Sequence, residues 1–210
     1  FQKMDKSYEG VFRFGTTTDS FDRDGKVTET GPAPNLTLDQ WQTAAARFVG
    51  PQSQLPPAFS AKRIGSRRAY DLAREGTEFT LEPVPVEIYG FEVDPVTESD
   101  LHFRLKCSSG TYVRAVARDL GQAVGSPAHC FQLCRMAVGS FSVQQCNPLD
   151  APFDPKGFIP FDTIDAGLAL HRTGPREERL LLNGQDIPAP PALYGQGRLV
   201  KVLSPTGRFL

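Results

Sequence analysis

Apolar and polar residues alternate along several short stretches of the chain, and this alternation is typical of β-strands that have one buried face. The clearest stretches are residues 6–14 (KSYEGVFRF), 84–96 (VPVEIYGFEVDPV) and 100–107 (DLHFRLKC). On the third predicted strand, one face carries Leu101, Phe103, Leu105 and Cys107. Because successive side chains of a strand point to opposite faces, we expect these four to enter the core.

The turn-rich sequence TDSFDRDG follows the first predicted strand and leads through an Asp-Gly turn into residues 26–30. We therefore expect residues 6–14 and 26–30 to form a hairpin with a long loop. Pro56 and Pro57 lack backbone donors and bias the residue before each toward extended geometry. Residues 51–62 are thus expected to be extended or to form the edge of a sheet.

Other stretches space their apolar residues three and four positions apart, as an amphipathic helix does. After the third strand, the predicted buried stripe of a helix consists of Val113, Val116, Ala117, Leu120 and Val124. Thr37 and Gln40 form a capping box before another helix, and Ser126 and Pro127 can cap and begin a further one. Helices are expected at residues 38–49, 66–75, 113–124, 128–138 and 176–184.

These elements predict an α+β protein with a mixed, largely antiparallel sheet and flanking helices, because the strands group in hairpins and do not alternate regularly with helices. The amino-acid composition changes near residue 150, where a proline-rich linker begins. We expect one domain at residues 1–150 and a linker with a small β-rich domain at residues 151–210, including a strand at 197–204. The chain starts at Phe1 and stops just after a turn, so it is expected to be part of a longer protein with an incomplete appendage.

Arg114 occupies an unusual position for a cation. The Ser-Ser-Gly turn that precedes the helix at 113–124 places this arginine in the helix's first turn. That turn carries partial positive charge from unpaired N–H groups, so a cation there is disfavoured by a few tenths to ~1 kcal/mol unless an anion faces it. Arg114 is therefore expected to face an anion.

Charge, cysteine content and hydropathy indicate which binding sites and partners to expect. The net charge is −1, but Lys62, Arg63, Arg67, Arg68 and Arg74 cluster in SAKRIGSRRAYDLAREG and can form either a phosphate-facing patch or a solvated helix face. The four cysteines form no C-x-x-C pair, and we expect neither a metal site nor a cofactor. No apolar run is long enough to span a bilayer, which predicts a soluble, cytoplasmic protein without a membrane partner.

Three segments resemble one family. KSYEGVFRFGTTTDSFDRDG is similar to the K-x-Y strand and G-x-x-T-D-T-x-D-x-x-G loop of the TruB family of bacterial tRNA pseudouridine synthases. QLPPAFSAKRIGSRRAYDLAREG is similar to the family's Q-x-P-P-x-[YF]-S-A segment, and CSSGTYVRAVARDLG is similar to its C-x-x-G-T-Y-[IV]-R segment. The three occur in the family's order and cover residues 6 to about 143.

The resemblance implies isomerisation of uridine to pseudouridine at position 55 in the T-loop of tRNA, with the base flipped out of its stack. It implies that Arg114 faces a catalytic aspartate and that Tyr8 stacks on the flipped base. The remaining implied site residues are Tyr112 and Leu133, which would line the pocket, and Lys62 and Arg135, which would contact RNA phosphates or support the pocket. It further implies a PUA-like RNA-binding appendage, no guide RNA and no cofactor, and a monomer is expected by default.

The family's nucleophilic aspartate lies in a G-G-x-L-D-P-x-A-x-G segment, and nothing in these 210 residues matches that segment. We therefore expect the nucleophile to lie upstream of Phe1 and the 210 residues alone to be inactive. The pair Asp22 and Asp24 is interpreted as turn capping. Cys134 replaces the first arginine of the family's L-R-R triplet. The alternative is a non-catalytic protein that binds tRNA and helps it fold.

Overall fold

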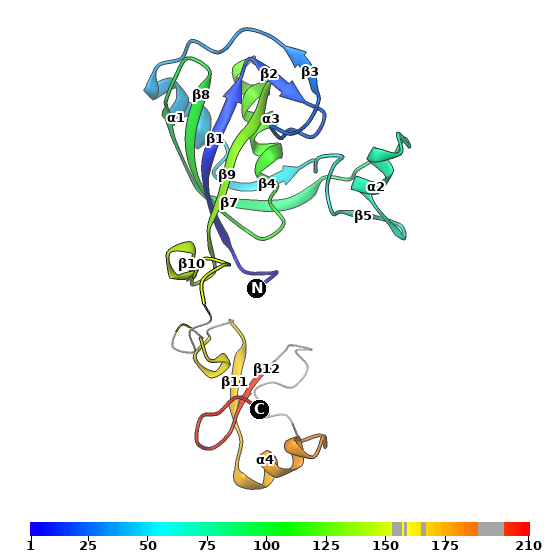
Figure 1. The fold of residues 1–210 in the computed structure, drawn as a ribbon, viewed down its shortest axis with the longest axis vertical. Helices are drawn as coiled ribbons and strands as arrows, with labels where there is room; N and C mark the ends of the chain where they lie inside the picture. Colours follow the sequence, from blue (N-terminus) through cyan, green and yellow to red (C-terminus); the bar gives the residue numbers. More distant parts are fainter. Residues whose placement is uncertain (153–156, 158, 165–166, 189–199) are drawn as a thin grey trace. The chain divides into compact units, whose positions relative to one another are not determined.

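The computed structural model describes residues 1–152, 157, 159–164, 167–188 and 200–210, and Figure 1 shows its elements in chain order. The chain divides into two compact units, Phe1–Gln145 and Cys146–Leu210. The site residues implied by the sequence all belong to the first unit.

The first unit is built on a six-stranded sheet with the order β10-β9-β1-β8-β7-β4, in which every neighbouring pair is antiparallel. Its strands are β1 (Lys6–Phe14), β4 (Gly50–Gln54), β7 (Val84–Pro95), β8 (Asp100–Cys107), β9 (Ala128–Val138) and β10 (Phe141–Ser142). Two short hairpins accompany the sheet: β2 (Thr16–Thr18) with β3 (Val27–Thr30), and β5 (Arg63–Ile64) with β6 (Arg67–Arg68). The expected α+β class with a largely antiparallel sheet is confirmed.

Burial follows the alternation of the sequence. On β8 the four predicted side chains are each at most 2% exposed. On β7 the buried positions are Val86, Ile88, Phe91 and Val93, so the alternation changes phase in the middle of the strand. A register shift between Ile88 and Gly90 explains this change, because an extra residue on one strand returns the following side chains to the core face.

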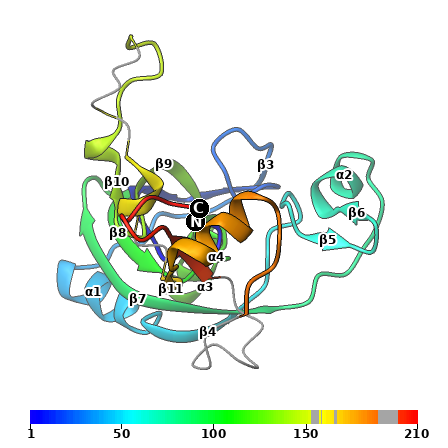
Figure 2. The same cartoon turned by 90° about the horizontal axis from the view of Figure 1, so that it is seen from below.

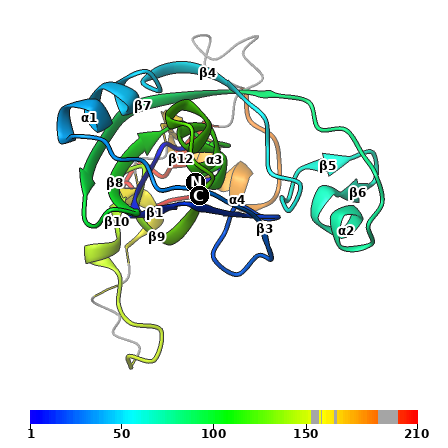
Figure 3. The ribbon, with the colours of Figure 1, turned by 90° about the horizontal axis from the view of Figure 1, so that it is seen from above.

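Helices α1 (Leu38–Ala46) and α3 (Val113–Val124) cover the core face of the sheet (Figures 2 and 3). The expected capping box begins α1: the Thr37 hydroxyl accepts from the Gln40 amide at 3.4 Å, and the Gln40 side chain accepts from the Thr37 amide at 2.8 Å. Helix α3 ends at Gly125, whose φ of +72° favours glycine. In the core, the apolar stripe of α3 packs against the sheet side chains, among them the stacked rings of Phe12 and Phe103.

Helix α2 (Ala69–Arg74) and the hairpin β5–β6 form an arm, residues 60–76, that extends away from the sheet in Figures 2 and 3. The helix expected at residues 66–75 is thus shorter, because Arg67 and Arg68 belong to strand β6. The residues before the arm form β4 at the edge of the sheet, as Pro56 and Pro57 led us to expect.

The expectation of a helix at residues 128–138 is wrong, because these residues form strand β9. Ser126 does not act as the cap of a helix: its hydroxyl accepts from the Gly15 amide at 3.1 Å and donates to the Pro32 carbonyl at 2.8 Å. Strand β9 pairs along β1 through two register shifts, and a Cβ at Gly10 would clash with the Gln132 carbonyl oxygen. Pairing with a distant strand therefore overrides the local helical signal.

The expected hairpin partner of residues 26–30 is also wrong. Strand β3 pairs with β2, whereas β1 pairs with β8 on one side and with β9 on the other. The chain leaves the sheet after Phe14, at Gly15, whose φ of +86° turns it into the separate β2–β3 ribbon. A turn in which the Gly25 amide donates to the Asp22 carbonyl is present where the Asp-Gly turn was predicted, but the loop that contains it belongs to this ribbon.

The second unit contains strands β11 (Ala169–Arg172) and β12 (Val200–Leu203), which pair in parallel, and helix α4 (Pro175–Leu182). The helix expected near residues 176–184 is present. Of the strand expected at 197–204, residues 197–199 lie outside the described residues. The PUA-like character of this unit remains a prediction. In the described ranges, no helix of either unit is both long and apolar enough to cross a membrane.

Candidate active site around Arg114

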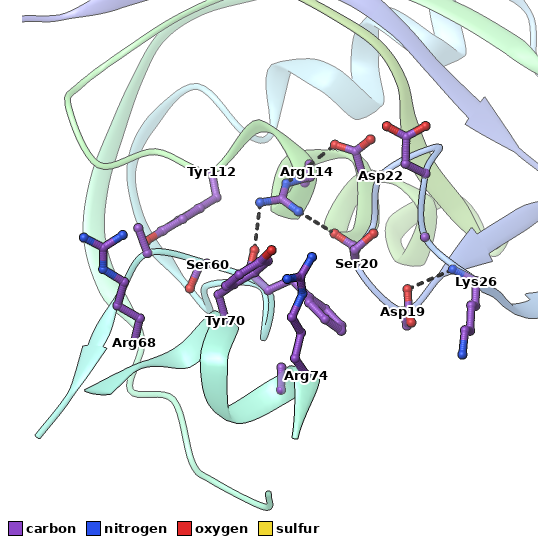
Figure 4. Close-up of a pocket in the computed structure, with 15 residues that line it drawn as sticks. Asp19, Ser20, Asp22, Lys26, Ser60, Arg68, Tyr70, Arg74, Tyr112 and Arg114 are labelled. Atoms are coloured by element: carbon purple, nitrogen blue, oxygen red, sulfur yellow. Dashed lines mark hydrogen bonds and ion pairs between the residues drawn. The ribbon is translucent and has the colours of Figure 1, made fainter. Parts of the chain in front are cut away.

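A pocket of about 910 Å³ opens between three segments of the first unit. Figure 4 shows its walls: the loop after β2, the arm, and the start of α3. The loop contributes Asp19, Ser20, Asp22 and residues 24–26, the arm contributes Ser60, Arg68, Tyr70 and Arg74, and α3 contributes Arg114 with Tyr112 directly before it. Segments that lie up to 95 residues apart in sequence therefore meet around one hollow.

Arg114 lies at the centre of this arrangement (Figure 4). Its Nη1 donates to the Ser20 carbonyl at 3.1 Å, and its Nη2 donates to the Phe59 carbonyl at 2.9 Å. Its Nε lies 3.9 Å from the Asp22 carboxylate. The guanidinium therefore connects the loop to Phe59, the residue just before the arm. Because the side chain is 24% exposed, part of it still faces the pocket. An anion does face the first-turn cation, as expected, and in this structure the anion is Asp22.

The loop that holds Asp22 has a defined backbone. The buried Thr18 hydroxyl accepts from the Asp22 amide at 3.0 Å and donates to its carbonyl at 2.7 Å. Phe21 has a φ of +55°, a conformation that is uncommon for a bulky residue and costs of order 1–3 kcal/mol. The backbone of Asp22 also bridges to Cys130 on β9. These contacts aim the carboxylate of Asp22 at Arg114.

The buried side chain of Gln54, at the end of β4, fixes the backbone of Tyr112 just before α3. Its Oε1 accepts from the Tyr112 amide at 2.8 Å, and its Nε2 donates to the Tyr112 carbonyl at 3.2 Å. A backbone N–H and C=O that are both satisfied by one buried amide hold a single conformation. The Tyr112 ring, which lines the pocket in Figure 4, is therefore anchored at its base.

The arm brings positive charge and an aromatic ring to the opposite wall. Arg74 stacks on Tyr70 with its guanidinium carbon 4.3 Å from the ring centroid, and both side chains face the pocket in Figure 4. Arg67 is paired with Glu75 and is therefore partly neutralised, whereas Arg63 is exposed. The arm can offer cations and stacking surface to an anionic, planar ligand.

Of the site residues expected from sequence, Tyr112 and Arg114 line this pocket, and the others lie elsewhere among the described residues. Tyr8, on β1, packs partly against the core, and the Arg135 guanidinium carbon lies 5.8 Å from its ring centroid. Leu133 is next to them on β9 and is 47% exposed. Lys62 lies on the arm, where its carbonyl accepts from the Ala69 amide. The roles expected for these four residues remain predictions.

Sequence reasoning missed Asp22 and Gln54. Asp22 was interpreted as a turn cap, and its position beside Arg114 depends on a fold that joins residues 92 positions apart. The signal that could have found it was the T-D-S-F-D segment, which belongs to the first of the three motifs. Nothing in the sequence marked Gln54 as a site residue except its position two residues before Pro56 and Pro57.

Histidines and carboxylates do not gather into a metal site in the described residues. His129 bonds through Nδ1 to the Thr16 carbonyl at 2.8 Å, and His102 lies 2.9 Å from the Glu9 carboxylate. These two rings take part in local structural contacts, and neither lines the pocket around Arg114.

The cysteines provide a test of this packing. Burial raises the pKa of the Cys130 thiol to about 12, with Asp22 adding to the effect and Arg114 opposing it. Burial also raises the pKa of Cys107, whereas Cys134 and Cys146 are exposed. At pH 8 a thiol with a pKa near 12 is thiolate only to on the order of 1 part in 10⁴, so iodoacetamide is expected to label Cys134 and Cys146 in the native protein and to spare Cys130 and Cys107.

Peptide mass spectrometry after a short alkylation measures this selectivity, and full labelling after denaturation provides the control. Rapid labelling of Cys130 in the native protein at pH 8 would contradict the packing described.

Because the Cys130 pKa is raised on folding, the neutral thiol stabilises the fold below about pH 8.5, and this contribution declines as the pH rises toward 12.

Comparison with known proteins agrees with the three motifs. The model of the TruB family pseudouridylate synthase N-terminal domain matches residues 1–113, which is more than half of the chain. The chain belongs to the TruB family. A TruB relative named tRNA pseudouridine synthase B, from Solibacter usitatus (strain Ellin6076), is 34% identical over 215 residues that cover 99% of this chain and 73% of the relative.

Other TruB relatives carry the same name. The one from Dechloromonas aromatica (strain RCB) is 35% identical and covers 96% of this chain and 71% of the relative. The one from Mycobacterium bovis (strain ATCC BAA-935 / AF2122/97) is 41% identical over 149 residues, which cover 69% of this chain but 50% of the relative. The chain thus spans between about half and three quarters of the length of the relatives named here.

Solved structures show the same fold. A Cbf5-Nop10-Gar1 complex contains a chain that matches all of this one with a TM-score of 0.67 and 16% identity, over 59% of its own length. An H/ACA RNP bound to a substrate RNA containing 2'-deoxyuridine gives a TM-score of 0.61 at the same identity, over 58% of the matched chain. At 16% identity, these two similarities show only that the chain has the same fold.

Proposed function

We propose that this chain is part of a tRNA pseudouridine synthase, which isomerises uridine to pseudouridine. The observation that carries the proposal is the Arg114 pocket, with its paired carboxylate and its aromatic walls, in a member of the TruB family. The names of the relatives support tRNA as the substrate class. They also make the non-catalytic tRNA-binding alternative the less favoured one.

The pocket has the size and lining that a flipped nucleotide requires. A cavity of about 910 Å³ lies within the usual range of roughly 300–1,000 Å³ for small-ligand sites. Taking a base out of its stack costs a few kcal/mol, which aromatic contacts can offset. Tyr70 and Tyr112 present aromatic surface in the pocket, and Tyr8, on strand β1, is proposed as a further stacking residue.

The reaction rearranges one molecule without adding or removing atoms. The C1′–N1 bond breaks, a C1′–C5 bond forms, the C5 proton leaves to a base, and N1 gains a proton. We propose that Arg114 orients the reacting carboxylate and keeps it ionised, because a guanidinium beside a carboxylate favours its charged form. Asp22, held by the Thr18 hydroxyl, would in turn orient Arg114.

We propose that the nucleophilic aspartate comes from a segment outside these 210 residues. None of the aspartates here lies in a segment that resembles G-G-x-L-D-P-x-A-x-G, and Asp22 belongs to a different motif. The 210 residues alone are accordingly proposed to lack turnover. Action at position 55 of the T-loop and independence from a guide RNA belong to the same proposal and follow the bacterial form of the motifs. A monomeric state and a cytoplasmic location are also part of the proposal.

Release of tritium from tRNA labelled at C5 of uridine tests the function. The intact open reading frame that contains this chain is expected to release the label from a T-arm uridine, and the 210-residue chain is expected to release none. An intact protein that binds tRNA but releases no label at any position would overturn the proposal in favour of the non-catalytic alternative.

The arm gives a further prediction. Arg63→Ala is expected to weaken tRNA binding and to lower the slope of log Kd against log salt by roughly 0.7–0.9, the value for one lost phosphate contact. Arg67→Ala serves as the matched control, because Arg67 is paired with Glu75 and should contribute less. Filter binding at several salt concentrations measures both variants. Equal effects of the two substitutions would show that the exposed charge of Arg63 has no special role.

A further inference from the structure

Arg118 lies one helical turn after Arg114 on α3, and its side chain is 13% exposed. Its Nε donates to the Asp119 carboxylate at 2.7 Å, and its Nη2 donates to the Leu55 carbonyl at 3.0 Å. The Asp119 carboxylate, a neighbour in the chain, orients the guanidinium plane. Arg118 is therefore a nearly buried arginine in a single fixed geometry.

The guanidinium carbon of Arg118 also lies 5.2 Å from the centroid of the Phe21 ring. Phe21 separates Ser20 from Asp22, the two loop residues that Arg114 contacts. It is also the one non-glycine residue with positive φ in the described part of the chain. A strained backbone persists only where its surroundings hold it, and contact with an arginine across an aromatic face is one such restraint.

The two arginines of α3 thus hold the same two segments. Arg114 bonds to the carbonyls of Ser20 in the loop and Phe59 before the arm. Arg118 contacts the neighbouring loop residue, Phe21, and the carbonyl of Leu55, four residues before Phe59. Residues four apart on a helix lie on the same face, about 6 Å apart. The contacts of Arg118 therefore join the same two segments as those of Arg114, one helical turn farther along α3.

Arg118 stands away from the hollow that Arg114 faces. Arg118 and Phe21 both line two other cavities, of about 270 and 980 Å³, and neither residue is among those that line the Arg114 pocket. The pair forms a wall behind the loop, so removing the Arg118 side chain would take away support for Phe21 without opening the pocket itself.

We propose that Arg118 is a positioning residue that sets the relative placement of Asp22 and Arg114 by fixing Phe21 and the Leu55 carbonyl to α3. The inference rests on the proposed function and deepens it. Because a displacement of about 1 Å at reacting groups can cost about 10²-fold in rate, Arg118→Met is expected to lower the single-turnover rate by about 10–100-fold. The Kd for tRNA is expected to stay within about twofold, since Arg118 faces away from the pocket.

The experiment compares Arg118→Met, Arg118→Lys, Phe21→Leu and the double variant Phe21→Leu/Arg118→Met in the intact open reading frame. Tritium release with the enzyme in saturating excess over tRNA measures the single-turnover rate, filter binding measures the Kd, and thermal unfolding measures the Tm. Arg104→Met is the matched control, because Arg104 lies on the outer face of the sheet beside Glu9 and Glu92.

If Arg118 acts through Phe21, the rate losses of the two single variants will not multiply in the double variant, whereas independent losses would. Arg118→Lys should recover only part of the rate, because lysine retains the charge but lacks the planar fork. An Arg118→Met variant with an unchanged rate, with multiplicative losses, or with a weaker Kd at an unchanged rate would overturn the inference.

A second measurement is independent of turnover. Hydrogen exchange of the intact protein is expected to be severalfold faster at the Phe21 amide in Arg118→Met and unchanged in Arg104→Met, because the Phe21 amide bonds to the Thr18 carbonyl inside the supported loop. Unchanged exchange at Phe21 would overturn the inference. A wild-type protein without tritium release would instead overturn the proposed function, and the exchange result would still decide whether Arg118 positions the loop.

Discussion

Replacing Arg114 with alanine in the intact open reading frame is expected to reduce uridine isomerisation by at least about 10²–10³-fold, while tRNA binding stays measurable. The substitution removes the two hydrogen bonds to the carbonyls of Ser20 and Phe59 and leaves Asp22 without its cation. It therefore breaks the connection between the loop and the residue just before the arm, and it removes the group that would orient the reacting carboxylate. Tritium release and filter binding measure the two effects on the same preparation.

Arg114→Lys would distinguish charge from shape. Lysine keeps the positive charge, but it cannot donate in a fixed plane to two carbonyls on different segments. We expect it to recover less than a tenth of the wild-type rate. Arg104→Ala, on the outer face of the sheet, is the control for loss of an ion-paired arginine as such. Near-normal turnover in Arg114→Ala would refute the role assigned to this residue.

Replacing Phe103 with alanine is expected to lower the free energy of unfolding of the first unit by about 3–5 kcal/mol. Phe103 is fully buried on β8 and stacks on Phe12 of β1, with ring centroids 4.0 Å apart. The loss combines the transfer of a large apolar side chain with the cavity that it leaves between two strands. Urea unfolding followed by the fluorescence of Trp41 measures the change, since this single tryptophan is buried in the same core.

Two variants calibrate that measurement. Phe103→Leu keeps most of the apolar volume and should cost no more than about 1.5 kcal/mol. Phe1→Ala removes a ring that is 60% exposed and should change the free energy of unfolding by less than about 0.5 kcal/mol. A Phe103→Ala variant as stable as Phe1→Ala would mean that the β1–β8 stack does not contribute as the structure indicates.

Local patterns were sufficient for elements whose burial follows their own sequence. Strand β8 alternates, helix α3 has one apolar stripe, and the capping box at Thr37 satisfies its own backbone groups. Strand β9 could not be recognised in this way. Its segment contains good helix-forming residues after a Ser-Pro start, and its conformation is set by pairing with β1, more than 110 residues earlier in the chain.

The residues of the candidate site also differ in whether the local sequence could reveal them. Arg114 could be found from sequence because a cation in the first turn of a helix is locally unfavourable and needs an explanation. Asp22, Gln54 and Arg118 gave no such signal, since a carboxylate in a turn, a glutamine before prolines and an arginine on a helix are all ordinary. Their roles depend on which segments the fold brings together.

The central position of β1 also has a consequence for the order of folding. Among the described strands β1 is made first, but both of its neighbours come late, because β8 ends at residue 107 and β9 at residue 138. A nascent chain that ends before β9 leaves one edge of β1 unpaired, and it leaves the Asp22 loop without its bridge to Cys130. Bringing such distant segments together is slow compared with forming a helix. During synthesis, the pocket should therefore become competent to bind a nucleotide only after about two thirds of these residues have been made.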